Sequence, residues 1–319
     1  MVSKELKFQD QVFNPGEKGV IKISVGKLTS GTDIELEAHI FRSKKPGNTT
    51  LLLAGVHGDE INGIEILRRT LKEKYLHKLF SGTVIVIPIV NLYGFINFNR
   101  YVPDGKDVNR SFPGTLNGSL ASRIARTLTK YIFPHIDYIF DFHTGGDLRY
   151  NYPQIRYSKN DSTAAQLANV FFAPYTIRSG IIPKSLRKTA KTMSIPTLIY
   201  EGGESIRLNH DSISIGLQGL LRCLVHLGHI NKKYLEHATY KNTIIENTSW
   251  IRSSHSGIFI FNKRSGETIV KGEKLASIND PYARKTNYII AKKSGHIIGH
   301  NNASVVNHGD ALFHIGFTS

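Results

Sequence analysis

Strand-like and helix-like segments alternate between residues 32 and 228, and this alternation limits the possible folds more than any other feature of the chain. Apolar or alternating runs predict strands over 32–41, 50–56, 83–90, 137–142 and 196–200. Apolar residues at helical spacing predict helices over 61–77, 119–133 and 211–228. Continuous apolar strands must be covered on both faces, so we expect an α/β fold with an open, mostly parallel sheet flanked by helices.

The pattern changes near residue 235. Only short strand-like pieces separated by turns follow, such as SGIFIF and ALFHIGF. We therefore expect two domains, a larger α/β domain over 1–235 and an all-β module over 236–319. A module of about 80 residues buries little surface and needs its neighbour for support.

The composition narrows the functional class. The 319 residues carry 41 Lys and Arg against 25 acids, a net charge of +16. This charge could attract nucleic acid, an anionic membrane surface or an acidic small molecule, although a solvated basic surface is the simpler explanation. The basic residues are dispersed and form no nucleic-acid-binding motif, so we expect no nucleic acid partner. No apolar run is long enough to span a bilayer, and the N-terminus has no signal-like segment, so we expect no membrane partner. The single cysteine, Cys223, excludes an intramolecular disulfide and fits the cytoplasm.

Ionisable side chains follow three of the predicted strands directly. His57 and Glu60 follow the strand at 50–56, His143 follows the strand at 137–142, and Glu201 follows the strand at 196–200. Ligands of open α/β sheets collect at the carboxyl ends of the strands. Two histidines and one glutamate form the ligand set of a catalytic zinc site. From the residues alone, hydrogen-bonded structural histidines remain an equal alternative.

Four motifs in order resemble the succinylglutamate desuccinylase/aspartoacylase family, a branch of the zinc carboxypeptidase superfamily. They are AGVHGDEINGIE, NRYVPDGKDVNRSFPG, DFHTGG and IPTLIYEGGE. The resemblance covers residues 50 to about 230, and the C-terminal module is also similar to that of the family. It implies a zinc-carboxypeptidase-like catalytic domain over 1–235 with a mixed, mostly parallel sheet, and one zinc ion per chain. We expect the module over 236–319 to cap the active site.

The resemblance also implies roles for the strand-end residues. His57, Glu60 and His143 match the metal ligands, and Glu201 matches the general base that takes a proton from the attacking water. We expect Asp141 to orient a neighbouring ligand from behind.

Further residues match the family's substrate contacts. Arg100 matches the residue that stabilises the oxyanion, and Asn109 and Arg110 match the pair that binds a substrate carboxylate. Arg187 matches another carboxylate-binding arginine. We expect Asp107 to fix the loop that carries Asn109 and Arg110.

The function implied is a zinc-dependent amidohydrolase that removes an acyl group from an N-acyl amino acid or a similar small carboxylate. One alternative is a zinc carboxypeptidase acting on short peptides, and another is a non-catalytic basic binding protein on the same fold. The family places a substrate-binding tyrosine in the C-terminal module, for which Tyr282 and Tyr288 are the candidates. A homo-oligomer is compatible with the sequence, which does not fix the oligomeric state.

Overall fold

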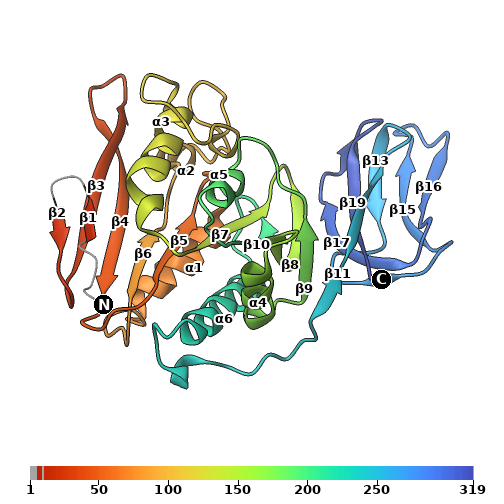
Figure 1. Ribbon diagram of the computed structural model, residues 1–319. Coiled ribbons are helices and arrows are strands. Elements are labelled where there is room, and N and C mark those ends of the chain that lie inside the picture. Colours follow the sequence, from red (N-terminus) through yellow and green to blue (C-terminus); the bar gives the residue numbers. More distant parts are fainter. Residues whose placement is uncertain (1–5, 9–10, 319) are drawn as a thin grey trace.

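The most apolar segments of the chain form the centre of a large sheet. In the computed structural model, which describes residues 6–8 and 11–318, these strands are β5 (Thr49–Ala54), β6 (Thr83–Ile87), β7 (Tyr138–Gly145) and β10 (Thr197–Glu204). They lie in the order β6-β5-β7-β10 and run parallel to one another. Helices cover both faces of the sheet (Figure 1), which explains why these strands are apolar throughout. The predicted α/β class is confirmed.

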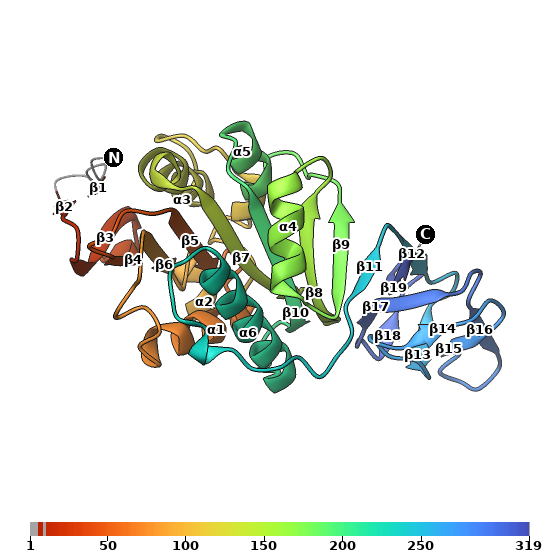
Figure 2. The same ribbon diagram turned by 60° about the horizontal axis from the view of Figure 1, so that its bottom comes forward.

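Successive residues of a central strand face opposite helix layers. Leu51 and Leu53 pack in one apolar core with α3 (Leu120–Thr127) and α5 (Leu186–Thr192). Leu52 and Ala54 pack in a second core, with the other long helices. These are α1 (Ile61–Lys72), α4 (Ser162–Phe171) and α6 (His210–His226). Figure 2 shows α3 and α6 on opposite sides of the strands.

Antiparallel strands flank the parallel centre, so the sheet is mixed, as predicted. Beyond β6 lie β4 (Asp33–Arg42) and β3 (Lys18–Lys27), and beyond β10 lies β8 (Arg149–Ser158), which runs antiparallel to it. β9 (Tyr175–Ser179) pairs in parallel with β8. Two short strands near the N-terminus, β1 (Leu6–Phe8) and β2 (Gln11–Phe13), form a separate antiparallel pair.

Two helices are shorter than their apolar periodicity predicts. α1 ends at Lys72 rather than near residue 77, and Lys74 adopts a left-handed backbone with φ of 59°. α3 ends at Thr127 and continues as a π-helical turn (Leu128–Ile132) and a 3₁₀ turn (Phe133–His135). Pro134 lies in this last turn and has no N–H to donate, so a regular helix cannot continue through it.

The strands that follow residue 242 form a small β module joined to the large sheet. β11 (Thr243–Ile245) pairs with β9, and β17 (Gly295–Asn301) pairs antiparallel with β8. β19 (Ala311–Phe317) and β12 (Asn247–Arg252) extend the sheet from β17, and β14 (Thr268–Ile269) also pairs with β17. A second sheet contains β13 (Gly257–Phe261), β15 (Lys274–Asn279), β16 (Thr286–Ile290) and β18 (Val305–Val306). Between the two sheets lies a core that includes Phe259, Leu275 and Phe313.

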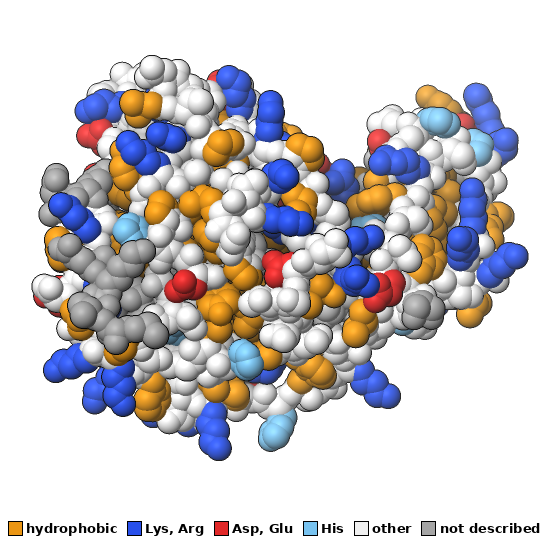
Figure 3. All heavy atoms as spheres, in the orientation of Figure 1, with side chains coloured by type: hydrophobic (Ala, Val, Ile, Leu, Met, Phe, Trp, Pro, Cys, Tyr) orange, Lys and Arg blue, Asp and Glu red, His pale blue; other side chains and the backbone are white. Residues whose placement is uncertain are grey.

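Two surface features bear on the expected partners. Lys and Arg side chains are scattered over the face shown in Figure 3 rather than gathered in one band. Within residues 6–8 and 11–318, no helix has the length and apolarity that a membrane crossing requires.

Candidate active site

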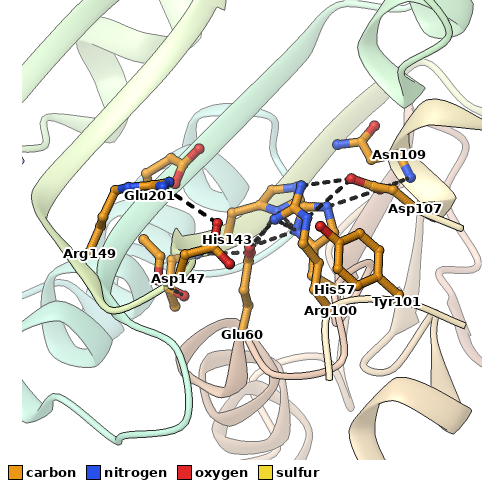
Figure 4. Close-up of polar contacts among 12 residues, drawn as sticks. His57, Glu60, Arg100, Tyr101, Asp107, Asn109, His143, Asp147, Arg149 and Glu201 are labelled. Atoms are coloured by element: carbon orange, nitrogen blue, oxygen red, sulfur yellow. Dashed lines mark hydrogen bonds and ion pairs between the residues drawn. The ribbon is translucent and has the colours of Figure 1, made fainter. Parts of the chain in front are cut away.

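His57, Glu60 and His143 meet at the carboxyl ends of β5 and β7 (Figure 4). Glu60 is the N-cap residue of α1, and His143 lies in the second half of β7. Glu60 Oε1 is 2.6 Å from His57 Nδ1, and Glu60 Oε2 is 2.8 Å from His143 Nδ1. The two Nδ1 atoms are 3.3 Å apart, and all three side chains are buried. Three potential ligand atoms therefore converge on one point.

The opposite ring nitrogens of both histidines face carboxylates. Asp107 Oδ1 lies 3.4 Å from His57 Nε2, and Asp141 Oδ2 lies 2.9 Å from His143 Nε2. A carboxylate in this position favours a proton on Nε2 and leaves the Nδ1 lone pair for a metal. Two ligands at zinc–nitrogen distances on a tetrahedral ion would be about 3.3 Å apart. The donor set fits a zinc-like ion, and the 3.3 Å between the two Nδ1 atoms matches this spacing.

Without a metal, the pKa values of His143 and Glu60 move in opposite directions. Burial lowers the pKa of His143, but Asp141 and Glu60 outweigh burial and hold that pKa well above its ordinary value. Burial raises the pKa of Glu60, but His57 and His143 outweigh burial and hold that pKa well below its ordinary value. A metal ion would therefore compete with a proton on His143.

The turn that carries His57 and Glu60 depends on a glycine between them. A Cβ atom on Gly58 would lie 1.9 Å from the carbonyl carbon of Gly94, in helix α2 (Leu92–Ile96). Only glycine allows the turn to pack this closely on α2. This contact places the turn beside the segment that leads to Arg100.

Asp107 connects Arg100 to the backbone of the loop that carries Asn109 and Arg110. It accepts hydrogen bonds from Arg100 Nε at 3.1 Å and Nη2 at 2.8 Å, and from the backbone N–H of Asn109 at 2.7 Å. Burial raises the pKa of Asp107, but His57 and Arg100 outweigh burial and keep that pKa far below its ordinary value. Arg100 Nη1 also donates to Glu60 Oε1 at 3.2 Å. Asp107 thus fixes this loop, as predicted, and holds the Arg100 guanidinium against the metal-ligand cluster.

Asn109, Arg110 and Arg187 lie together on the side of the site formed by α5. Asn109 Oδ1 accepts a hydrogen bond from the backbone N–H of Leu186 at 2.9 Å. Arg110 is exposed, and its Nη1 donates to the Asn109 carbonyl at 2.7 Å. Arg187 is buried and donates to Ser179 Oγ at 2.7 Å. Burial and the neighbouring Arg156 lower the pKa of Arg187 to about 10, so Arg187 remains charged at neutral pH.

Glu201 lies on β10 directly beside His143 on β7, its partner in the parallel register. Its Oε2 accepts a hydrogen bond from Asn151 Nδ2 at 2.9 Å, and its Oε1 is 3.5 Å from Arg156 Nη1. Asn151 and Arg156 were not predicted as site residues, because β8 was not predicted as a strand. A β-bulge brings both to one face, since Asn151 pairs with Gly203 but Gln154 pairs with Glu201.

One cavity of about 430 Å³ contains all eight predicted site residues. They are His57, Glu60, Arg100, Asn109, Arg110, His143, Arg187 and Glu201. Arg149, Asn151 and Arg156 also line the cavity, so arginines are its commonest ionisable residue. Such a cavity suits a small anionic ligand.

The C-terminal module contributes Trp250 of β12 to the cavity wall. The indole stacks on His314 of β19, with ring centroids 4.2 Å apart and planes 2° from parallel. Neither tyrosine candidate lines this cavity. Tyr282 and Tyr288 are exposed, and Lys274 Nζ lies 3.3 Å from the centroid of the Tyr288 ring. The aromatic side chain that the module supplies to the site is therefore a tryptophan.

The remaining histidines do not form a second metal site in the described part of the chain. His57, Glu60 and His143 make up the only group there with three ligand atoms close enough to share an ion. The buried His229 is held by Thr50 Oγ1 at 2.8 Å and the Ser81 carbonyl at 3.0 Å.

Comparisons with known proteins find relatives that match most of the chain. The N-alpha-acetyl-L-2,4-diaminobutyric acid deacetylase of Halomonas elongata is 27% identical over 249 residues, which cover 73% of this chain and 71% of the relative. The product-bound ectoine utilization protein EutE of Ruegeria pomeroyi has the same fold, with a TM-score of 0.87, 21% identity and 98% of both chains covered. A succinylglutamate desuccinylase/aspartoacylase of Rhodobacter sphaeroides superposes with a TM-score of 0.83 at 23% identity, covering 95% of this chain and 96% of that one.

A family model accounts for the segment that carries the site. The model of the succinylglutamate desuccinylase/aspartoacylase catalytic domain matches residues 46–227, more than half of the chain, and includes all eight predicted site residues. The chain belongs to the succinylglutamate desuccinylase/aspartoacylase family.

Proposed function

We propose that this protein is a zinc-dependent amidohydrolase that releases an acyl group from a small N-acyl amino acid. One observation carries the proposal. The buried ligand atoms of His57, Glu60 and His143 converge in the same cavity as Glu201 and several arginines. Fold similarity alone would not assign the reaction, because function resides in the site.

The side chains of this chain would divide the chemistry between them. When bound, zinc supplies Lewis acidity that polarises the scissile carbonyl and makes water more acidic. Glu201 takes the proton of the attacking water and later delivers it to the leaving amine. Arg100, held by Asp107, stabilises the negative charge that develops on the carbonyl oxygen.

The substrate would be anchored by its carboxylate. Asn109 and Arg110 offer neutral and charged donors at one side of the cavity, and Arg187 adds a second, buried cation. A planar guanidinium binds a carboxylate through two parallel hydrogen bonds. The Halomonas deacetylase is named for a substrate of this type, an acetylated amino acid.

Trp250 favours a small substrate over a peptide. Its indole forms part of the cavity wall and is fixed by the stack on His314. A long peptide would have to displace this wall, so the carboxypeptidase alternative is less well supported. The non-catalytic alternative is also less well supported, because a simple anion-binding site needs neither the ligand cluster nor Glu201.

A substrate panel tests the proposal. Zinc-loaded and chelator-treated protein should be assayed on N-acetyl and N-succinyl amino acids, on the matching carboxamides, and on peptides of four or more residues. We expect turnover of the acyl amino acids, loss with chelator, and weak activity on carboxamides. Glu201→Gln should keep the metal and lose about 10²–10⁴-fold in rate. A preference for the peptides would instead indicate a carboxypeptidase, and equal activity on carboxamides would exclude the carboxylate anchor.

A further inference from the structure

Two side chains of β8 contact the Glu201 carboxylate, one at each oxygen, and we call this pair the bracket. Asn151 Nδ2 donates to Oε2 at 2.9 Å, and Arg156 Nη1 lies 3.5 Å from Oε1. Asn151 is 8% exposed, so its amide has little access to bulk water. The β-bulge in β8 is what allows both side chains to face β10.

A strand of the C-terminal module pairs with β8 on the side away from β10 and supports this bracket. β17 lies beside β8 (Figure 1), with Gly299 paired to Asn151. Gln154 links the two strands, because it accepts from Arg156 Nε at 3.2 Å and donates to the Ile298 carbonyl at 3.3 Å.

Gly299 leaves the space that the Asn151 amide occupies. A Cβ atom on Gly299 would lie 2.8 Å from Asn151 Oδ1, which is too close for an unshifted amide. Gly299 has no positive φ, so its requirement for glycine is one of space rather than of backbone conformation.

Such a bracket matters for a group that must take a proton from water. A general base works within about 2.6–3.2 Å of that proton, and a misplacement of about 1 Å can cost about 10²-fold in rate. A free glutamate side chain samples several rotamers and would often point away from the reacting water.

We propose that Asn151 and Arg156 are positioning residues for Glu201, and that β17 of the C-terminal module holds them in place. This inference rests on the proposed function, in which Glu201 is the general base. The module then contributes to turnover itself, in addition to forming the cavity wall at Trp250.

A double-mutant cycle tests the bracket. Asn151→Ala and Arg156→Gln are measured alone and in the Glu201→Gln background, with kcat, KM and zinc content determined for each. Alone, each change is expected to lower kcat about 10- to 100-fold while KM stays within about threefold. In the Glu201→Gln background the same changes are expected to have little further effect, because the group they position no longer acts.

The cycle also separates the inference from the proposed function. If each change lowers kcat by the same factor in both backgrounds, the residues act independently of Glu201 and the inference is wrong. If the single variants keep full kcat while Glu201→Gln loses it, the inference is wrong and the proposed function stands. Full activity of Glu201→Gln would instead overturn the proposed function.

Gly299→Ala tests the support from the module. The added methyl should displace the Asn151 amide and lower kcat about tenfold or more, with zinc content unchanged. Asn302→Ala is the matched control, since it removes a hydrogen bond from the module to Glu204 without touching the bracket, and should keep wild-type kcat. Equal kcat in Gly299→Ala and wild type would contradict the role of β17. If Gly299→Ala does not fold, Gln154→Leu, which cuts the link to Ile298, takes its place with the same expected result.

Discussion

Asp141→Asn should weaken zinc binding although Asp141 is not itself a ligand in the proposed site. The carboxylate is buried, and its Oδ2 lies 2.9 Å from His143 Nε2. Asparagine keeps the size of the side chain and still presents an oxygen to the imidazole, but it removes the charge that makes the imidazole a stronger ligand. Loss of such an outer partner typically costs about 10–100-fold in metal affinity, or about 1.4–2.8 kcal/mol.

The loss should depend on pH in a defined direction. Of the two carboxylates that raise the pKa of His143, Asp141 contributes more. In the wild-type protein, zinc must therefore displace a proton from His143 at low pH. In Asp141→Asn the pKa of His143 falls and this competition weakens. The ratio of wild-type to variant affinity should therefore be larger at pH 8 than at pH 6.

Competition titration with a chromophoric chelator at pH 6, 7 and 8 measures this ratio. Asp137→Asn is the matched control, because Asp137 directly precedes β7 and accepts a hydrogen bond from the Thr49 N–H at 2.7 Å, at the end of the strand away from the site. An unchanged zinc affinity in Asp141→Asn would refute the reasoning, as would an equal loss in Asp137→Asn.

Three further predictions concern the substrate anchor, the protonation of His143 in metal-free protein and the cavity wall. Arg110→Ala should lower kcat/KM by the equivalent of about 1.5–3 kcal/mol on acyl amino acids and leave rates on their carboxamides unchanged, as initial-rate kinetics can show. In metal-free protein the raised pKa of His143 stabilises the fold below about pH 6.5, and this contribution is lost as pH rises through that pKa. Melting temperatures with chelator should therefore fall above pH 6.5, whereas the stabilisation by added zinc should grow. Trp250→Ala should raise the rate on acyl peptides relative to acyl amino acids by about tenfold, in competition assays with both substrates.

The sequence predicted the centre of the site because its residues follow the most apolar strands. β5, β7 and β10 are neighbours and parallel, so residues at their carboxyl ends are brought together by the sheet itself. The register places Glu201 directly beside His143. No local sequence pattern specifies this pairing, but both residues lie at the carboxyl ends of parallel strands, where the ligands of such sheets collect.

The second side of the site could not be predicted in the same way. β8 carries buried polar residues such as Asn151 and Gln154, and its bulge interrupts the alternation that identifies a strand. Trp250 reaches the cavity only because the module is joined to the large sheet through β8 and β17. Pairings between strands so distant in sequence leave no local signal.

The charges within the cavity give a stronger argument for an anionic substrate than the net charge of the chain. On the face shown in Figure 3 the lysines and arginines are scattered, so the value of +16 says little about one ligand. Inside the cavity, Arg100 is paired with Asp107 at 2.8 Å, Arg149 with Asp147 at 3.5 Å and Arg156 with Glu201 at 3.5 Å. Arg110 and Arg187 have no carboxylate within ion-pair distance in the described part of the chain. These two are the arginines that we propose bind substrate, so a carboxylate between them would complete the charge pairing of the site.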